Sequence, residues 1–277
     1  MSRATGIDHV GIVGRDLPSL AATFEHLGFC LTPLARHAGG RTGNRCVMLR
    51  NGGYLELMST IDGGTSATLE RFLMRHAGAH ILALEIDNDD PVMARLRLAW
   101  DAVPEVSHTD RAVDDTDAAG PRARFTLITP PDPPEGRVHL IRHLTPDVLW
   151  QERFVRHGNS AVALDEVILA VPTPATTAAW FSVLAGRRVA PDSAGGFSLD
   201  LPRGRVRVLA PEGFATAMPG LSGPSPPCIA GLTLRTDDGN AAVRRLLADR
   251  TIPFQTTAGS VTVEAAGVTL RFNCCTA

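Results

Sequence analysis

Apolar and polar residues alternate in two short segments near the start of the chain, and a helical pattern follows each of them. Residues 7–16 read Ile-Asp-His-Val-Gly-Ile-Val-Gly-Arg-Asp, and residues 79–87 read Ala-His-Ile-Leu-Ala-Leu-Glu-Ile-Asp. An alternation of this kind is typical of a strand with one buried face. His9 and His80 stand at the heads of the two strands. We therefore predict two imidazoles on equivalent strands, which is a starting point for a metal site.

The same order of elements, a strand, an acidic cap, a helix and further strands, can be traced four times. The four copies begin near Ile7, Ala79, Leu164 and Ile229. Each helix carries apolar residues three or four positions apart, as a buried helical face requires. The strands after the helices are predicted at residues 31–36, 45–49, 54–59, 105–108, 122–128, 136–143, 196–200, 205–209, 254–257, 260–264 and 268–272. Connecting helices are predicted at residues 66–75 and 146–156.

A single βαβββ module leaves one face of its sheet without a covering layer, so modules of this kind are expected to pair. We predict an α+β fold of four βαβββ modules in two pairs. Each pair forms a curved, incompletely closed mixed sheet around a cavity, with the helices outside. The first pair is expected to span residues 1–157 and the second residues 158–277, with a hinge at His157-Gly158-Asn159-Ser160.

Composition and charge exclude several classes of function. The 277 residues are 44% hydrophobic and 20% charged, which is enough for a folded core, and the net charge is −2. A near-neutral chain lacks the basic surface of a nucleic-acid-binding protein. The five cysteines form no CxxC pair, and no apolar run reaches the length of a membrane span. We therefore expect a cytoplasmic protein with a small-molecule substrate and no nucleic-acid or membrane partner; a homodimer is compatible with this picture.

Several segments of the first half carry a family resemblance. These segments are residues 8–13, 43–49, 53–57 and 143–151. With them the chain resembles the vicinal oxygen chelate superfamily of glyoxalase I, fosfomycin and bleomycin resistance proteins and extradiol dioxygenases, and within it the glyoxalase-like domain proteins. The resemblance covers residues 6–157 well and residues 164–277 only as a degenerate copy. It implies paired βαβββ modules and a divalent metal in the cavity of an active pair, with ligands on the first and fourth strands.

Strand alternation predicts which side chains face that cavity. The residues expected to face the helices are Val10, Ile12, Leu55, Leu57, Ile81, Ala83, Val138 and Leu140. Their polar neighbours His9, Glu56, His80 and His139 are then expected on the cavity side. Imidazoles with one carboxylate suit iron(II), manganese, zinc, nickel or cobalt better than magnesium or calcium. These four residues are our candidate metal ligands.

Glu56 and His139 are also the candidate catalytic residues, because either can move a proton. A carboxylate within an apolar strand needs a partner, which favours Glu56 as a ligand or a base. His139 is open to three roles: a fourth ligand, a general base, or a residue that lines the cavity. His9 and His80 are equally open to being buried histidines without a metal.

Arg45 and His143 are the candidate substrate-binding residues. Arg45 follows Asn44 in a segment that carries the resemblance, and a guanidinium can clamp a substrate carboxylate. His143 follows His139 on the same strand face, near the strand end. Arg45 and Arg124 are alternatively arginines of the protein surface.

The second half of the chain provides an internal control. Asp165-Glu166-Val167 stands where the first module has Asp8-His9-Val10, and the stretch after His157 contains no histidine. We therefore expect no metal site of this type in the second pair. It is expected to support the first pair, form an interface or cap the cavity.

Two classes of function fit these patterns. The first is a metal-dependent enzyme of glyoxalase-like type, a lyase or isomerase that acts on a small substrate with adjacent oxygen atoms. An extradiol-type dioxygenase is less favoured, because Glu56 shares its module with His9 and not with the second histidine. The rival is a metal-free binding protein that sequesters a small compound and pairs Glu56 with a histidine or an arginine.

Overall fold

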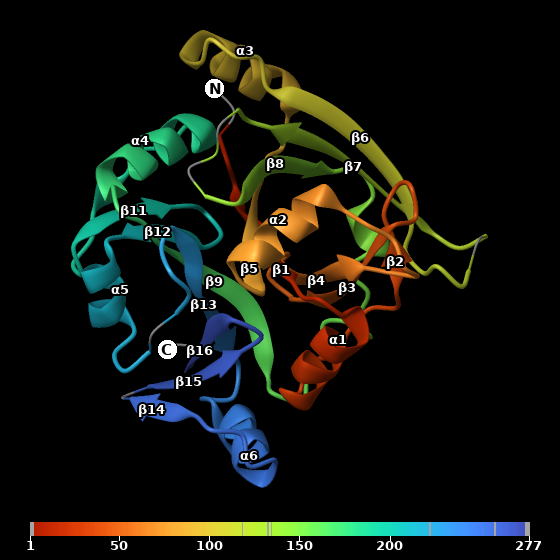
Figure 1. Cartoon of the computed structure of the whole chain (residues 1–277), viewed down its shortest axis with the longest axis vertical. Helices are drawn as coiled ribbons and strands as arrows, with labels where there is room; N and C mark the ends of the chain where they lie inside the picture. The colour runs from red at the N-terminus through yellow and green to blue at the C-terminus, as the bar shows by residue number, and fades with distance from the viewer. Residues whose placement is uncertain are drawn as a thin grey trace.

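The computed structural model describes residues 3–117, 119–131, 133, 135–221, 223–257 and 259–274. Within them the chain forms two eight-stranded mixed sheets that lie next to each other, with helices around them (Figure 1). The predicted α+β fold of paired modules is confirmed. Among the described residues, no helix has both the length and the apolar character needed to cross a membrane.

The first sheet holds the first two modules. Its elements are β1 (Gly6–Val13), α1 (Leu17–His26), β2 (Ala35–Arg36), β3 (Thr42–Met48), β4 (Tyr54–Thr60), α2 (Ala67–Arg75), β5 (Gly78–Glu85), α3 (Asp89–Ala99), β6 (Glu105–Ala112), β7 (Arg122–Thr129) and β8 (Arg137–His143). The strand order is β2-β3-β4-β1-β5-β8-β7-β6. The first strand of each module runs parallel to its fourth, and β1 and β5 join the modules in antiparallel fashion. The edges β2 and β6 approach each other, so the sheet is nearly closed.

The second sheet repeats this arrangement strand for strand. Its elements are β9 (Ala161–Ala170), α4 (Pro174–Ala185), β10 (Ala190–Pro191), β11 (Gly196–Asp200), β12 (Arg205–Leu209), α5 (Pro211–Ala217), β13 (Cys228–Thr236), α6 (Ala241–Asp249), β14 (Gln255–Thr257), β15 (Ser260–Ala265) and β16 (Val268–Cys274). The order β10-β11-β12-β9-β13-β16-β15-β14 has the same parallel and antiparallel pairs. Residues at matching register positions in the two sheets are therefore structurally equivalent.

Helix starts follow local chemistry. The Asp16 side chain accepts a hydrogen bond from the Ser19 backbone nitrogen at 2.8 Å, and Pro18 occupies the first turn of α1, where its missing N–H costs nothing. Gly28 follows α1 with a φ of 85°, a conformation that glycine adopts without strain. These signals explain why the acidic residue after β1 marks the start of a helix.

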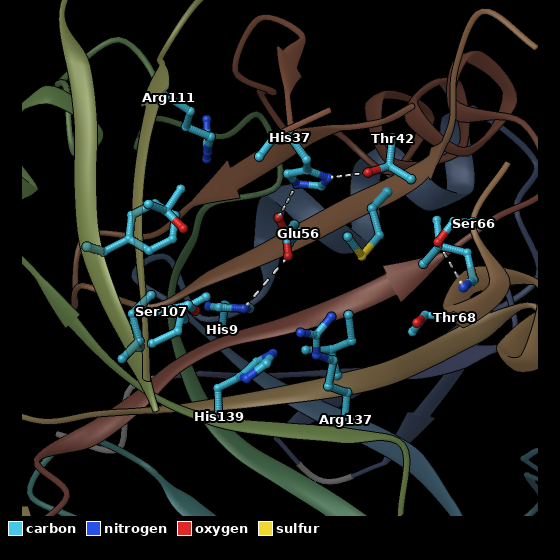
Figure 2. Close-up of a pocket in the computed structure, with 18 of the residues that line it drawn as sticks. His9, His37, Thr42, Glu56, Ser66, Thr68, Ser107, Arg111, Arg137 and His139 are labelled. Atoms are coloured by element: carbon cyan, nitrogen blue, oxygen red, sulfur yellow. Dashed lines mark hydrogen bonds and ion pairs between the residues drawn. The ribbon is translucent and has the colours of Figure 1, made fainter. Parts of the chain in front are cut away.

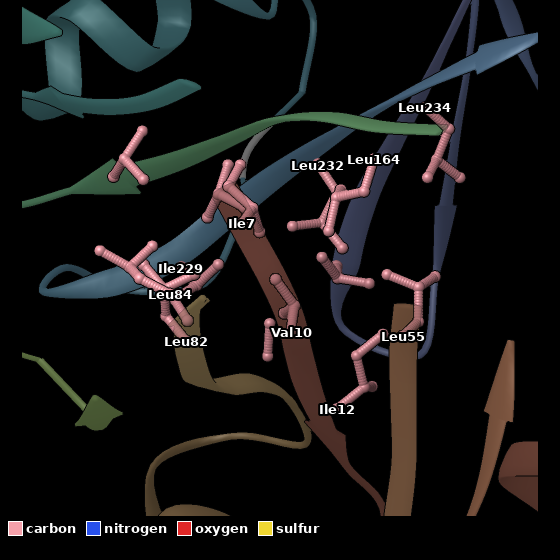
Figure 3. Close-up of a cluster of buried hydrophobic side chains, with 14 of the residues drawn as sticks. Ile7, Val10, Ile12, Leu55, Leu82, Leu84, Leu164, Ile229, Leu232 and Leu234 are labelled. Carbon is pink, nitrogen blue, oxygen red and sulfur yellow. The ribbon is translucent and has the colours of Figure 1, made fainter. Parts of the chain in front are cut away.

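One apolar core lies between the two sheets. Val10 and Ile12 of β1 and Leu55 of β4 are fully buried there, together with Leu164 and Leu232 of the second pair (Figure 3). The convex face of the first sheet thus packs partly against the second pair as well as against helices. The division at residue 157 stays a prediction, because the core runs through both halves.

Two details of the predicted helices are wrong. Residues 146–156 form only a 3₁₀ turn, Pro146–Val148, because the following segment folds back and buries Leu149 and Phe154 in a small cluster with Tyr54. Helix α5 was not predicted; it packs Phe214 against Ile168 and Leu209 on the concave side of the second sheet. Helix α2 takes the same place in the first sheet, where Leu69 and Phe72 contact Val13.

Candidate functional site

A cavity of about 410 Å³ lies inside the curve of the first sheet. Its polar lining consists of His9, His37, Glu56, Arg111, Arg137 and His139, and apolar residues such as Phe125 and Ile141 complete the walls (Figure 2). Three of the four predicted metal ligands therefore meet in one cavity.

The strand register explains this convergence. His9 on β1 lies opposite Ala83 on β5, and Ala83 lies opposite His139 on β8, so the two histidines share one row across the sheet. Glu56 on β4 lies opposite Gly11, two residues beyond His9. Because residues two apart on a strand share a face, all three polar side chains point into the concave side. The predicted orientation of these three residues is confirmed.

A β-bulge at the start of β1 places Asp8 beside His9. The register shifts between Ile7 and His9, so Asp8 is an extra residue in the strand. A bulge turns two adjacent side chains towards the same face. The Asp8 carboxylate accepts a hydrogen bond from His9 Nδ1 at 2.7 Å and another from His143 Nε2 at 3.1 Å. Nε2 of His9 is left facing the cavity and Glu56 (Figure 2).

The charges around His9 set its protonation. Burial alone would lower its pKa, but the hydrogen bond and charge of Asp8 and the charge of Glu56 outweigh burial, so the pKa of His9 lies above its usual 6.5. Burial would raise the pKa of Asp8, yet its two histidine partners hold that pKa well below the usual range. Asp8 is therefore an anion that holds His9 in one orientation.

Glu56 is held by three neighbours. Asn44 Nδ2 donates a hydrogen bond to its Oε1, His37 Nε2 lies 3.3 Å from the same oxygen, and His9 Nε2 lies 3.7 Å from Oε2. Burial would raise the pKa of Glu56, but the hydrogen bonds and the charges of the two histidines lower it well below its usual range. Glu56 is a carboxylate anion at neutral pH.

His139 is buried with one nitrogen tied to the protein. Its Nδ1 lies 3.1 Å from Thr129 Oγ1. Burial first, and the charge of Arg137 second, lower the pKa of His139 to about 3. The imidazole is therefore neutral at physiological pH, which is the form that can bind a metal. Among the residues that the structure describes, however, no three histidine, cysteine or acidic side chains are arranged closely enough to ligate one ion.

His80 does not line this cavity. The register shifts between Gly11 and Ile12, which makes His80 an extra residue in β5 and leaves Ile81 on the cavity wall. The expectation that Ile81 and Ala83 face the helices is wrong, because Leu82 and Leu84 are the residues of β5 that enter the core outside the sheet. His80 Nε2 donates to the backbone carbonyl of His76 at 2.9 Å, and its ring stacks on Phe72 at 4.7 Å. A bulge, which no periodicity reveals, carries His80 under α2.

The two predicted substrate-binding residues also lie elsewhere. Arg45 points to the outer face of β3, where its guanidinium contacts Glu25 at 2.9 Å and the Thr32 carbonyl at 3.0 Å. The side chain of His143 is buried, and its Nε2 donates to Asp8 and does not reach the cavity. Neither residue is among those that line the cavity.

Sequence reasoning missed several residues of the site. Asp8 was visible beside His9, but only the bulge gives it a role. His37 and Asn44 come from β2, β3 and the loop between them, and Arg111 comes from the edge strand β6. Alternation within β6, where Ser107, Thr109 and Arg111 share one face, was the available signal for the last of these.

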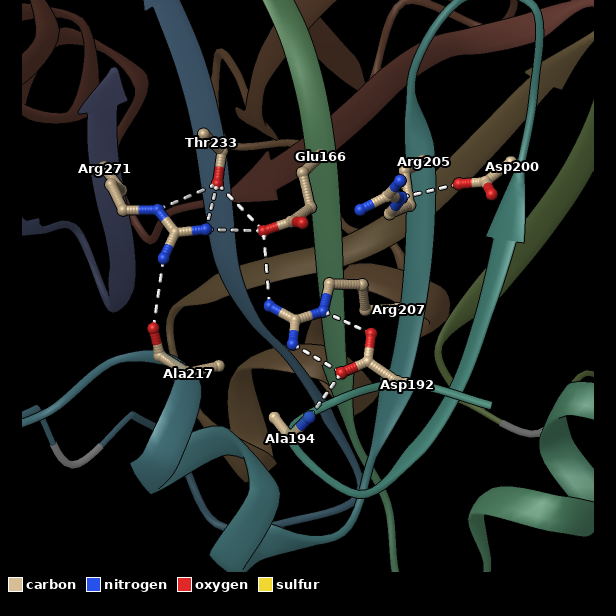
Figure 4. A network of polar contacts seen from close by, with 9 residues as sticks. All are labelled: Glu166, Asp192, Ala194, Asp200, Arg205, Arg207, Ala217, Thr233 and Arg271. Carbon is tan, nitrogen blue, oxygen red and sulfur yellow. Dashed lines mark hydrogen bonds and ion pairs between the residues drawn. The ribbon is translucent and has the colours of Figure 1, made fainter. Parts of the chain in front are cut away.

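The equivalent positions of the second sheet hold a different set. Glu166 on β9 lies opposite Thr233, which lies opposite Arg271, so Glu166 matches His9 and Arg271 matches His139. Arg207, opposite Ile168, matches Glu56. Arg271 Nη2 contacts Glu166 at 2.6 Å, and Arg207 binds Asp192 with two hydrogen bonds (Figure 4). Arginine and acidic side chains thus stand where the first pair has His9, Glu56 and His139, and the absence of a metal site from the second pair stays a prediction.

Comparison with known proteins identifies the family. The model of the glyoxalase-like domain matches residues 7–185, more than half of the chain. The chain belongs to the glyoxalase-like domain family. This assignment and the fold place it in the vicinal oxygen chelate superfamily. A search among curated proteins finds no match.

Solved structures share the glyoxalase-like fold at low sequence identity. A hypothetical protein from Staphylococcus aureus is 13% identical with a TM-score of 0.68, and the match covers 97% of this chain and 99% of that one. A catechol 2,3-dioxygenase is 13% identical with a TM-score of 0.57 (98% and 88%). A Mn(II)-bound glyoxalase from Novosphingobium aromaticivorans is 15% identical with a TM-score of 0.54 (99% and 83%). Likeness at this identity shows the fold alone.

Proposed function

We propose that the chain is a metal-dependent enzyme of glyoxalase-like type, a lyase or isomerase for a small substrate with adjacent oxygen atoms. The observation that carries the proposal is the convergence of His9, Glu56 and His139 in one cavity of the first pair. Two imidazoles and one carboxylate form a donor set that transition metals such as manganese, iron, cobalt, nickel or zinc accept.

The states of Glu56 and His139 support this reading, whereas His9, whose pKa is raised, must release its proton to bind an ion. Glu56 is an anion and His139 is neutral, as metal ligands must be. His9 carries Asp8 on its second nitrogen, an arrangement that fixes the ring and raises its basicity as a ligand. Binding would require Glu56 to exchange its contacts with His37 and Asn44, and His139 to approach the other two donors.

The roles of the chain's own residues follow from these contacts. A divalent ion, when bound, would supply Lewis-acid stabilisation of an oxyanion on the substrate. Asp8 holds His9 in place, and the cavity walls exclude water from the apolar part of the substrate. Glu56 or His139 moves the proton between neighbouring substrate atoms. The low pKa of both groups keeps them unprotonated before the substrate arrives. A pKa so far below neutral also makes a group a weak base, so proton transfer requires the bound substrate to raise the pKa of the group that accepts the proton.

One observation favours a second candidate, a metal-free binding protein. Glu56 is already engaged by His37, His9 and Asn44. In this reading the four side chains form a closed polar network that needs no ion, and the cavity retains its ligand by shape and hydrogen bonds.

Metal analysis separates the two candidates. We expect freshly purified protein to contain a near-stoichiometric transition metal, and chelated protein to regain thermal stability on addition of Mn²⁺, Ni²⁺, Zn²⁺, Co²⁺ or anaerobic Fe²⁺. Glu56→Gln and His139→Asn are expected to lose most of the metal. His108→Asn is the matched control, because His108 lies on β6 outside the set of cavity residues.

The alternative result is equally definite. Less than about one-tenth of an equivalent of metal, with no thermal shift for any of these ions, would exclude the enzyme and support the binding protein. If only Fe²⁺ restores stability, the identity of the ion would favour an oxygenase over a lyase or isomerase.

A further inference from the structure

Arg111 is a buried cation that lacks an acidic partner. Its side chain lies on β6 and lines the cavity, and the residue is only 8% exposed. Within the part of the chain that the structure describes, its guanidinium makes one hydrogen bond, from Nη1 to the carbonyl of Ala112 at 3.3 Å. Among the described residues, no carboxylate lies within 4.0 Å of the guanidinium. A buried charge without a partner lowers the stability of the fold. An anion from outside the chain that bound next to Arg111 would offset this loss.

The second pair shows how the same fold treats an arginine that has only a structural role. Arg207 and Arg271 lie on the concave face of the second sheet and each contacts an acid, Asp192 and Glu166 respectively. Both distances are 2.6 Å. Among the described residues, Arg111 has no such partner.

The strand that carries Arg111 presents a polar wall to the cavity. Ser107, Thr109 and Arg111 are spaced two residues apart and all line it. Apolar side chains line the cavity from β7, which contributes Phe125 and Leu127, and from Ile141 of β8. In Figure 2 Arg111 and Arg137 lie on opposite sides of His9 and Glu56. The cavity therefore offers one buried cation next to hydroxyl groups and a separate apolar surface.

We propose that Arg111 is a specificity-determining residue that binds a carboxylate of the substrate. The planar guanidinium matches a carboxylate with two parallel hydrogen bonds, and Ser107 and Thr109 can donate from the same wall. The apolar remainder of the substrate lies against Phe125 and its neighbours. This inference rests on the proposed function for the reaction, but the binding step can be measured without it.

The cavity lining favours a monoanion over a phosphate dianion. Arg111 is the buried arginine of that lining, and the other arginine, Arg137, is exposed. One buried guanidinium pairs with the single charge of a carboxylate, whereas the second charge of a phosphate would lie in the same cavity as the carboxylate of Glu56. A carboxylate supplies a single charge with the geometry that the guanidinium matches.

The test is calorimetric titration of the full chain, both as purified and after chelation. The probes are 3-phenylpropanoate, its uncharged amide 3-phenylpropanamide, and phenyl phosphate. The variants are Arg111→Gln, Arg111→Lys, and Arg124→Gln as the control, because Arg124 is exposed on β7 and does not line the cavity. Circular dichroism and thermal unfolding check that each variant folds.

We expect the wild type to bind the acid at least about tenfold more tightly than the amide. Arg111→Gln should weaken acid binding about 10- to 100-fold and leave amide binding within about twofold. Arg111→Lys keeps the positive charge but loses the two parallel hydrogen bonds of the guanidinium, so its affinity for the acid should lie between those of the wild type and Arg111→Gln. Arg124→Gln should match the wild type.

Three results would overturn the proposal. They are equal affinity of the wild type for acid and amide, unchanged acid binding in both Arg111 variants, and tighter binding of phenyl phosphate than of the acid. If Arg111→Gln does not fold, Arg111→Lys decides, and a loss of less than about twofold counts against the proposal. Metal content is measured on the same samples. If the wild type holds metal but binds the acid no better than the amide, the proposal for Arg111 fails and the proposed metal-dependent function stands. If the protein holds no metal but its binding of the acid still depends on Arg111, the metal-dependent function fails and the proposal for Arg111 stands.

Discussion

The concave faces of the two sheets have the same strand framework but carry different side chains at equivalent positions. In the first, His9, Glu56 and His139 border an open cavity of about 410 Å³. In the second, Glu166 and Arg271 stand at the positions that match His9 and His139, and α5 covers the face. The strand order is the same, so the difference arises from side chains and not from topology.

The difference lies in whether the groups can change their charge. Arginine stays protonated under all physiological conditions, so the second face is held together by permanent ion pairs. Histidine has its usual pKa near neutral pH, and the pKa of His9 is raised above it, so the first face can change its charge at His9 when a ligand or an ion binds. The two module pairs thus share one framework, but the first holds a site whose charge can change and the second holds a network of permanent ion pairs.

The largest expected effect comes from removing the central carboxylate of each face. Glu166→Gln leaves Arg271 buried without an acid, so we expect a loss of about 3 kcal/mol in the free energy of unfolding. Glu56→Gln should cost less than about 1 kcal/mol, because His9 can become neutral instead. Urea unfolding of metal-free protein measures both. Equal losses would contradict the contrast between a permanent and an adjustable face.

The second effect concerns the acidic residue that precedes each central position. Asp8 is fully buried and orients His9, whereas Asp165 has a side chain that is 38% exposed and contacts Arg235 at 3.0 Å. Asp8→Asn should reduce metal affinity about 10- to 100-fold. Asp165→Asn should leave metal affinity unchanged and shift stability by less than about 1 kcal/mol. Metal titration of both variants checks this; similar affinities in the two would remove Asp8 from its positioning role.

The third effect is a difference in acid sensitivity between the halves. Burial lowers the pKa of His139 to about 3 and, with the charges of His80 and Arg75, that of His76 to about 4. The pKa values of these two histidines in the folded protein lie below the unfolded value near 6.5, so the unfolded chain binds their protons more tightly. The free energy of unfolding is therefore unaffected by them above pH 6.5 and falls as the pH drops towards 4. His9, whose pKa is raised, contributes with the opposite sign and loses its contribution as the pH rises.

All nine histidines precede residue 158, so the acid-induced loss should be confined to the first pair. We expect a loss on the order of 2 kcal/mol there by pH 5. Hydrogen exchange of metal-free protein at pH 7 and pH 5, corrected for intrinsic rates, resolves the two halves. Equal acceleration in both sheets would show that the histidines of the first pair are not responsible.

The fold was predictable because its pattern recurs four times. The alternation around Val10, Leu55 and Leu140 assigned His9, Glu56 and His139 to the correct face, since an unbroken strand keeps its period of two. The faces of β5 were misassigned because residues 81–84 are apolar at every position, so alternation does not tell the two faces apart. The bulge at His80 then places this residue next to Phe72 of α2 and outside the cavity lining. Contacts between distant segments, such as Asn44 to Glu56, depend on tertiary structure and leave no periodic signal.

The smallest expected effect distinguishes two arginines that sequence reasoning could not separate. Arg45 was expected to clamp a substrate, but its ion pair with Glu25 lies on the outer face of β3 with both side chains partly exposed. An ion pair of this kind contributes about 0–1 kcal/mol. Arg45→Gln should therefore change stability by less than about 1 kcal/mol and leave the binding of 3-phenylpropanoate unaltered, whereas Arg111→Gln should weaken that binding. If Arg45→Gln weakens acid binding as much as Arg111→Gln does, the outer face takes part in recognition, and the contrast between the cavity wall and the outer surface of the first sheet no longer holds.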